Sequence, residues 1–323
     1  MSIEASLSRS GQNNESGSAT ALFENKMQTD VLRYFQSTNI SKELVTNKTI
    51  ADGKSASFPI IGNATAFYHT AGEELDGDNI AATDRTITVD AMLVGFAYIP
   101  DIDDAMVHYD ANSAYNESIG RALAKRFDQD CFRMIAVAGF IDDGTAATAA
   151  GLRTFGDDVF SEPEVFTSSG DELIGSKVYA EIVNAIAQWT EKDIPGEPVV
   201  VLQPRSYYAL LNNPANTGMT WANDEASQTG RVPLVLGKKV YTSPHLPQSD
   251  DSANTAIDAK YRADFSDVVG LVFSKECVAA LQLIGLTMRS DYVPTRLATL
   301  IAGKMAVGFG VLNHACSIPL LKS

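Results

Sequence analysis

Two alternating apolar segments separated by an acidic stretch constrain this chain more than any other feature. The segment from 55 to 69 places apolar side chains at even positions, and the segment from 85 to 99 places them at odd positions. Such alternation predicts two strands of a hairpin, whose arms of about 13 residues would each reach about 40 Å at ~3.3 Å per residue. A hairpin of this length cannot bury both faces on its own domain, so it needs another surface to lie on.

A long helical pattern follows the hairpin. Apolar residues recur at every fourth position, namely Ile119, Leu123, Phe127, Cys131 and Ile135. Because no proline interrupts the run, the spacing predicts a helix over 103–139, about 50 Å long at ~1.5 Å per residue. This is roughly three times the usual helix length, which indicates a structural strut.

The rest of the chain mixes helical and strand patterns. An amphipathic helix is expected from Asp171 to Trp189, and a short helix is expected over 204–212 after a proline. Strands are expected over 199–203, 238–243, 267–274, 280–288 and 297–313. This mixed order predicts an α+β fold with two intertwined subdomains.

Composition narrows the possible functions. The 323 residues carry a formal net charge of −15, so the surface should repel polyphosphate and should not bind nucleic acid tightly. The same charge is compatible with the wall of a container for DNA and equally with ordinary solubility. No apolar run is long enough to span a membrane, and we expect no membrane partner. The three cysteines are widely spaced, which predicts small buried side chains rather than disulfides or a zinc site.

The acidic stretch 101–110, DIDDAMVHYD, is the strongest candidate for a chemical site. On a helix, Asp104 and His108 would share a face at a spacing that metal ligands use. The stretch also begins the long helix, where carboxylates accept hydrogen bonds from free N–H groups, and Asp103 is the expected helix cap. We favour the cap. We assign no catalytic, cofactor-binding or metal-binding residue, and a metal-dependent enzyme using these acids stays as an alternative.

Charge is distributed unevenly between the hairpin and the helix. Ten acids lie between Glu73 and Asp110 against one base, Arg85, whereas the helix carries Arg121, Lys125, Arg126 and Arg133. These opposite charges could pair within one chain or between neighbouring copies, or each could simply be solvated.

Several stretches resemble the major capsid protein of short-tailed bacteriophages of the T-seven type, the podoviruses. They are GKSASFP at 53–59, GEELD at 72–76, TITVD at 86–90 and DAMVHYD at 104–110, and the likeness is strong from 53 to about 135. The later segments DVVGLVFSKECVA and IAGKMAVGFGVLN match in character and order.

The resemblance implies a Hong Kong 97-type phage capsid fold of the α+β class. It implies an N-terminal arm (1–54), an extended loop hairpin (55–100), a peripheral domain (101–171) with a long spine helix (103–139), an axial domain (172–280), and a C-terminal return to the peripheral domain (281–323). It implies a major capsid protein that self-assembles into hexamers and pentamers of an icosahedral virion shell around double-stranded DNA. A scaffolding protein and a portal are implied partners, with assembly in the host bacterial cytoplasm.

We expect the hairpin to contact a neighbouring copy. The expected contact residues are Phe58, Ile60, Phe67, Tyr68, Glu73, Glu74, Asp76 and Asp78, facing Arg121, Arg126 or Arg133 of the neighbour. No lysine occurs between Lys54 and Lys125, so covalent fusion of subunits through a hairpin amine, which some family members use, is not expected here. A bacterial shell of the same fold that stores cargo stays as the second alternative.

Overall fold

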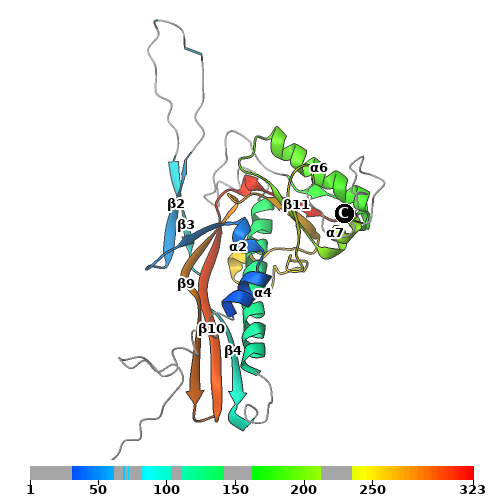
Figure 1. Ribbon diagram of the computed structural model, residues 1–323. Helices are drawn as coiled ribbons and strands as arrows, with labels where there is room; N and C mark the ends of the chain where they lie inside the picture. The colour runs from blue at the N-terminus through cyan, green and yellow to red at the C-terminus, as the bar shows by residue number, and fades with distance from the viewer. Residues whose placement is uncertain are drawn as a thin grey trace, which may run out of the picture. The chain divides into compact units, whose positions relative to one another are not determined.

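The computed structural model describes residues 31–61, 68–69, 72, 82–102, 111–141, 162–211 and 235–323. Within them, helices and strands mix along the chain, as expected for an α+β protein (Figure 1). The chain divides into two compact units. Unit 1 comprises residues 1–39, 90–127 and 282–307, and unit 2 comprises residues 40–89, 128–281 and 308–323.

Helix α4 and two long strands contribute residues to both units. Helix α4 spans Ala111–Gly139, and its last residue is the one predicted from the sequence. The predicted start at Asp103 lies outside the described residues. Strands β9 (Val278–Val293) and β10 (Ala298–Val311) run side by side in a four-stranded sheet of order β1-β9-β10-β4, in which β1 spans Thr46–Thr49 (Figure 1).

Unit 1 packs its part of this sheet on the first half of α4. Strand β4 (Leu93–Pro100) pairs antiparallel with β10, from Ala298 opposite Pro100 to Met305 opposite Leu93. Ile119 of α4 lies against Gly95 and Gly303 of this strand pair. The helical stretch 31–38 adds Phe35, whose ring meets that of Phe127 edge to face at 5.8 Å. Alternate side chains of β4 therefore face the helix.

Unit 2 contains a five-stranded mixed sheet of order β5-β11-β8-β6-β7. The central strand β8 is buried along its whole length, because it has a strand on each side and packing on both faces. The five strands are β5 (Glu164–Val165), β6 (Val199–Leu202), β7 (Val240–Thr242), β8 (Val268–Phe273) and β11 (Ser317–Leu321).

Helices complete unit 2. The second half of α4 is buried from Cys131 to Ala136, and Ser317 of β11 donates a hydrogen bond to the Ile135 carbonyl at 2.8 Å. The apolar spacing predicted a buried stripe of Ile174, Val178, Ile182, Ile186 and Trp189. Val178, Ile182 and Trp189 are buried together with Ala185, whereas Ile186 is half-buried and Ile174 is 46% exposed. The helices are α2 (Ser41–Leu44), α6 (Gly175–Glu191) and α7 (Pro204–Leu211), with short 3-10 turns at Asp171–Leu173, Ala259–Tyr261 and His314–Cys316.

The hairpin forms, but its returning arm differs from the prediction. Strands β2 (Ser55–Ile61) and β3 (Ala82–Thr88) pair antiparallel, from Ser55 opposite Thr88 to Ile61 opposite Ala82. We predicted one returning strand over 85–99. Instead the strand ends at Thr88, and residues 93–100 pair with β10. The N–H group of Asp90 donates to the Val307 carbonyl at 3.3 Å, so the chain joins β10 where it leaves the hairpin.

Candidate functional site

The described part of the β2–β3 hairpin buries very little of itself. Ser55, Ser57 and Pro59 of β2 are exposed, as are Asp84, Thr86 and Thr88 of β3. Ile87 is the buried exception at 2% exposure, and Val89 just beyond the strand is 7% exposed. Two strands alone are marginally stable in water, so a hairpin this exposed depends on what it contacts.

The buried end of the hairpin rests on β10. A Cβ atom added at Gly308 would overlap the Thr88 carbonyl oxygen, and one added at Gly310 would lie 2.7 Å from Cγ1 of Ile87. The Val89 N–H group donates to the Lys54 carbonyl at 2.8 Å, which closes the hairpin at its base. We call this contact of residues 87–89 with Gly308 and Gly310 the seat of the hairpin.

A second contact holds the outgoing strand. Lys48 of β1 donates from Nζ to the Ser57 carbonyl at 3.0 Å, and Nζ lies 4.6 Å from the centre of the Phe58 ring. Phe58, an expected intersubunit contact residue, is therefore half-buried and engaged within its own chain. We call this contact of Lys48 with Ser57 and Phe58 the tether.

The other expected hairpin residues are described only in part. Ile60 lies in β2 opposite Thr83, and Tyr68 is fully exposed. The remaining expected residues fall outside the described part of the chain, namely Phe67, Glu73, Glu74, Asp76 and Asp78, as does the expected helix cap Asp103. Their contacts with a neighbouring copy stay predictions.

The three expected arginine partners occupy different environments on α4. Arg121 is exposed and forms an ion pair with Glu117 one turn earlier, at 2.5 Å. Arg126 is half-buried. Arg133 is buried, and its guanidinium contacts Asp251 at 2.9 Å and Asp130 at 3.1 Å. Because the Arg133 guanidinium is already paired with two carboxylates of its own chain, the exposed Arg121 is better placed to contact acidic residues of a neighbouring copy.

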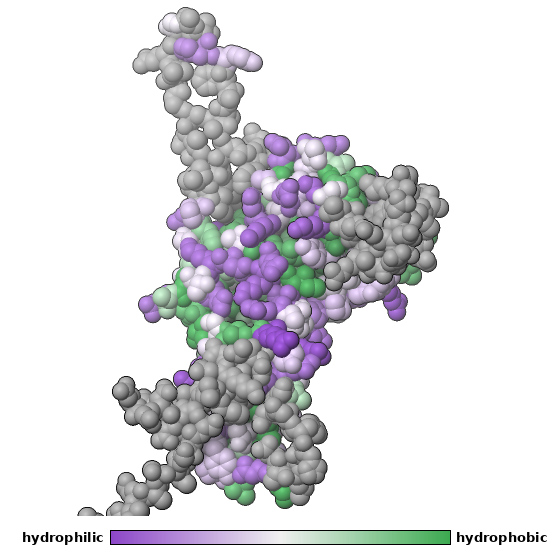
Figure 2. All heavy atoms as spheres, in the orientation of Figure 1, coloured by the Kyte–Doolittle hydropathy of each residue, from purple (hydrophilic) through white to green (hydrophobic). Residues whose placement is uncertain are grey.

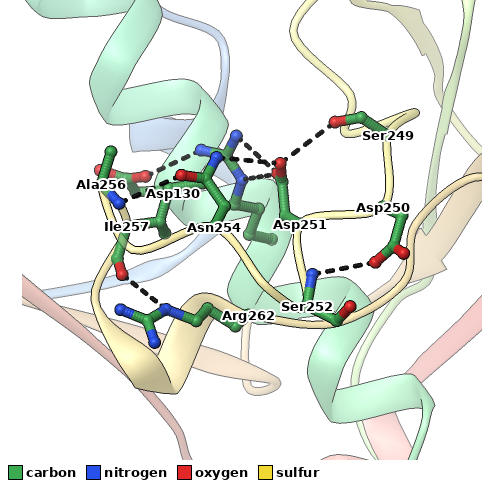
Figure 3. Close-up of polar contacts among 10 residues, drawn as sticks. Asp130, Ser249, Asp250, Asp251, Ser252, Asn254, Ala256, Ile257 and Arg262 are labelled. Carbon is green, nitrogen blue, oxygen red and sulfur yellow. Dashed lines mark hydrogen bonds and ion pairs between the residues drawn. The ribbon is translucent and has the colours of Figure 1, made fainter.

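The loop around Asp251 is held by a cluster of polar contacts. Ser249 and Asn254 both donate to the Asp251 oxygen that Arg133 does not contact, at 3.2 and 3.4 Å (Figure 3). Asn254 in turn accepts from the Ala256 N–H group at 3.1 Å, and Arg262 donates to the Ile257 carbonyl at 2.8 Å. The carboxylate is thus held on both oxygens, which makes this cluster a structural support for the loop.

A second buried carboxylate anchors the start of unit 2. Asp128 of α4 accepts from the Ser41 hydroxyl at 2.6 Å and from the Ser41 and Ile40 N–H groups at 3.1 and 3.4 Å. His245 Nδ1 lies 3.1 Å from the same carboxylate. Two distant chain segments, at 40–41 and at His245, therefore converge on one side chain of α4 that has no solvent exposure.

Sequence reasoning did not identify the exposed apolar face of β4. Val94, Phe96 and Tyr98 point away from α4 and are 46%, 64% and 37% exposed. The guanidinium of Arg296 stacks on the Tyr98 ring at 4.4 Å, and Leu300 pairs opposite Tyr98 on β10. Figure 2 shows hydrophilic and hydrophobic residues interspersed over the face that it presents. The signal was available, since 92–99 is apolar at both odd and even positions, whereas a solvated strand alternates.

The titratable groups of unit 2 are structural. Cys131, Cys277 and Cys316 are buried and free, as the sequence predicted. Burial raises the pKa of Cys316 to about 12, so its thiol stays protonated and unreactive at neutral pH. Burial likewise lowers the pKa of His314. Within the described ranges, no group of three metal-binding side chains occurs and no helix has the length and apolarity to cross a membrane.

Comparison with solved structures gives the class. The chain aligns with the capsid protein of cyanophage P-SCSP1u at a TM-score of 0.72 and 28% identity, covering 99% of both chains. The structure therefore has the α+β fold of phage capsid proteins, as the resemblance implied.

Sequence comparison gives the family. The chain is 27% identical to the major capsid protein of Escherichia phage T7 over 316 residues, which covers 92% of this chain and 90% of that protein. It is equally similar to the major capsid protein of Enterobacteria phage T3 over 322 residues, covering 94% and 92%. Residues 57–321 match the family described as Gp10A-like major capsid protein, and the chain belongs to that family. Its role is structural: copies of the chain assemble into the capsid shell of the virion.

Proposed function

We propose that the chain assembles into hexamers and pentamers of an icosahedral shell that encloses double-stranded DNA. Assembly would occur in the cytoplasm of the host bacterium, on a scaffolding protein and with a portal at one vertex. The observation that carries this proposal is the amount of hairpin and apolar sheet surface that the subunit leaves exposed. An extended hairpin buries little more than its base, and one sheet face exposes three large apolar side chains.

In the shell, we infer, another copy covers the outer face of β4. Val94, Phe96 and Tyr98 are apolar, adjacent on one strand, and more than a third exposed. Fully burying a side chain of this kind is worth about 1.5–3 kcal/mol. Because a closed shell repeats the same contact around every subunit, individually modest gains combine and one subunit leaves only when all its contacts break.

The acidic residues of the predicted hairpin tip would orient neighbouring copies and would add little to the free energy of association. Glu73, Glu74, Asp76 and Asp78 would meet Arg121 of the neighbouring copy, whose guanidinium is accessible on α4. An exposed ion pair of this kind is worth about 0–1 kcal/mol and weakens as salt rises. The net charge of −15 would keep enclosed DNA from adhering to the wall, so DNA is contained without tight specific binding.

Electron microscopy of the expressed full chain tests the proposal. Together with scaffolding protein, the chain should form closed icosahedral particles with both five-fold and six-fold positions. Virions should contain DNA that resists nuclease until the particles are opened. A chain that stays a compact monomer under these conditions would refute the shell. Closed particles that contain a protein cargo instead of DNA would replace this proposal with a storage shell.

A further inference from the structure

We propose that the seat on Gly308 and Gly310 and the tether from Lys48 together form a mount that sets the direction in which the hairpin leaves unit 2. The inference rests on the proposed function, and it identifies the residues that position the hairpin for shell assembly. All of these residues belong to unit 2.

The seat is a close contact at two β10 glycines, with the backbone of 88–89 at Gly308 and with the Ile87 side chain at Gly310. A Cβ at Gly308 would lie 2.9 Å from Cα of Val89 besides overlapping the Thr88 carbonyl. At Gly310 it would lie within 3.1 Å of three carbons of Ile87. Real Cβ contacts are longer than this, so any other residue at Gly308 would force the chain at 88–89 away from β10. Glycine here permits the close approach that fixes the returning strand.

The tether differs from the seat in kind. It consists of one hydrogen bond and one cation–π contact from a single lysine on β1, an exposed strand residue. Contacts of this type at exposed sites are individually weak. The tether can therefore release and reform without disturbing the packing of unit 2.

Attachments on both strands fix the orientation of the hairpin, whereas a single attachment would let the hairpin rotate about it. The seat holds β3 and the tether holds β2, so together they stop the hairpin from swinging about its base. Subunits at five-fold and six-fold positions must meet their neighbours at different angles. A fixed seat combined with a releasable tether allows the same hairpin to adopt both, with Lys48 setting the preferred direction.

Hydrogen exchange on unassembled full-length subunits tests the mount directly. In Lys48→Met, which keeps most of the apolar stem, exchange over 55–61 and 82–88 should become roughly three- to tenfold faster, as expected for losing one modest contact. Exchange over 268–273, the buried strand β8, should not change. Lys177→Met is the matched control, because Lys177 is exposed on α6 away from the hairpin. Exchange in the hairpin of Lys48→Met equal to that of the control would overturn the tether.

The seat is tested with Gly308→Ala against Gly285→Ala. Both change a strand glycine, but a Cβ at Gly285 meets only the end of the Gln282 side chain at 3.3 Å. Gly308→Ala should accelerate exchange at the Val89 amide and in the hairpin, whereas Gly285→Ala should leave both at the wild-type rate. Equal rates in the two variants would overturn the seat. If Gly308→Ala also accelerates exchange in β8, it has disturbed the whole unit, and the seat is then tested by Gly310→Ala, whose added Cβ has Ile87 side-chain carbons as its three nearest atoms. Hairpin exchange in Gly310→Ala equal to that in Gly285→Ala would overturn the seat.

Assembly provides the second measurement. Lys48→Met should give a lower yield of closed particles than Lys177→Met at the same concentration. The exchange results do not depend on shells, so the two proposals fail separately. If the wild-type chain forms no shell, the proposed function is lost while the mount can stand. If shells form and exchange is unchanged in the variants, only the mount is lost.

Discussion

Strands β8 and β4 are both rich in apolar residues, yet β8 is buried on both faces whereas β4 is exposed on one face. Each residue of β8 from Val268 to Phe273 is buried, because β11 and β6 flank it and other elements pack on both faces. Strand β4 lies at the edge of its sheet, and only alternate side chains face α4. Phe96 on the other face is 64% exposed, whereas Phe273 of β8 is fully buried.

The difference distinguishes surfaces that are buried by contacts within one chain from surfaces that stay exposed and available to neighbouring copies. The closed region, by which we mean β8 with its neighbouring strands and residues 131–136 of α4, is saturated by contacts within one chain. The open region, by which we mean the outer face of β4 and the hairpin, keeps apolar and charged groups accessible. Apolar area left in water is free energy still available for association. Changes in the closed region should therefore alter folding, and changes in the open region should alter assembly.

The largest effect on folding is expected for Arg133→Ala. Removing the guanidinium takes away the positive charge that faces Asp251 and Asp130, and Asp251, which keeps the neutral donors Ser249 and Asn254, is only 5% exposed. Loss of one member of a buried pair costs about 3–5 kcal/mol of unfolding free energy, since the remaining charge stays desolvated. Urea unfolding of unassembled subunits measures it. Arg121→Ala, which breaks an exposed pair on the same helix, should cost about 0.5 kcal/mol or less. Equal losses in the two variants would contradict the closed environment of Arg133.

The sequence predicted Arg133 as one of three candidate intersubunit partners because the helix is basic and the hairpin is acidic. That expectation requires Arg133 to lie on an exposed polar face of the helix. From Cys131 to Ala136, α4 is buried all round, and the partner Asp251 lies 118 residues further along the chain. Helical periodicity is a local signal and contains no information on a partner at that separation. The end of α4 and most of the buried stripe of α6 depend on local pattern alone, and Gly139, Val178, Ile182 and Trp189 were predicted correctly.

Replacing Phe96 by serine should separate assembly from folding. The side chain is largely exposed in the subunit, so its loss should change the unfolding free energy by less than about 1 kcal/mol. In the shell it would remove apolar area that another copy covers, at ~25 cal/mol per Å². We expect the yield of closed particles to fall sharply in electron micrographs and on a sizing column.

The matched control for Phe96→Ser is Tyr208→Ser on α7. Tyr208 is 60% exposed, nearly as much as Phe96, but it lies outside the face of β4. Tyr208→Ser should assemble as the wild type does. If both variants assemble normally, the outer face of β4 is not covered in the shell.

The hairpin shows which strand pairings the alternation of residues in the sequence can predict and which it cannot. Alternation predicted β2 and β3, because both strands keep a period of two and pair with each other. The odd positions stay apolar through Ile99, so they gave no sign that the strand breaks and that 93–100 pair with β10 some 200 residues away, although the even positions also become apolar from Met92. The role of Gly308 and Gly310 in the seat could not be predicted either, since it depends on the approach of Ile87 rather than on their own neighbours in sequence.

The smallest effect is expected for charge reversal in the acidic stretch between the two hairpin strands, which is the predicted tip of the hairpin. Glu73→Lys with Glu74→Lys should lower the yield of closed particles at low salt, because the tip would then repel Arg121 of the neighbouring copy. The effect should shrink as ionic strength rises past about 0.1 M, where the screening length falls to about 10 Å. Asp52→Lys with Glu191→Lys makes the same change in net charge at exposed positions away from the tip. If this control loses assembly equally, the effect comes from total charge alone. If instead the tip variant assembles normally at every salt concentration, the apolar face of β4 and the seat of the hairpin must determine subunit register without the acidic residues.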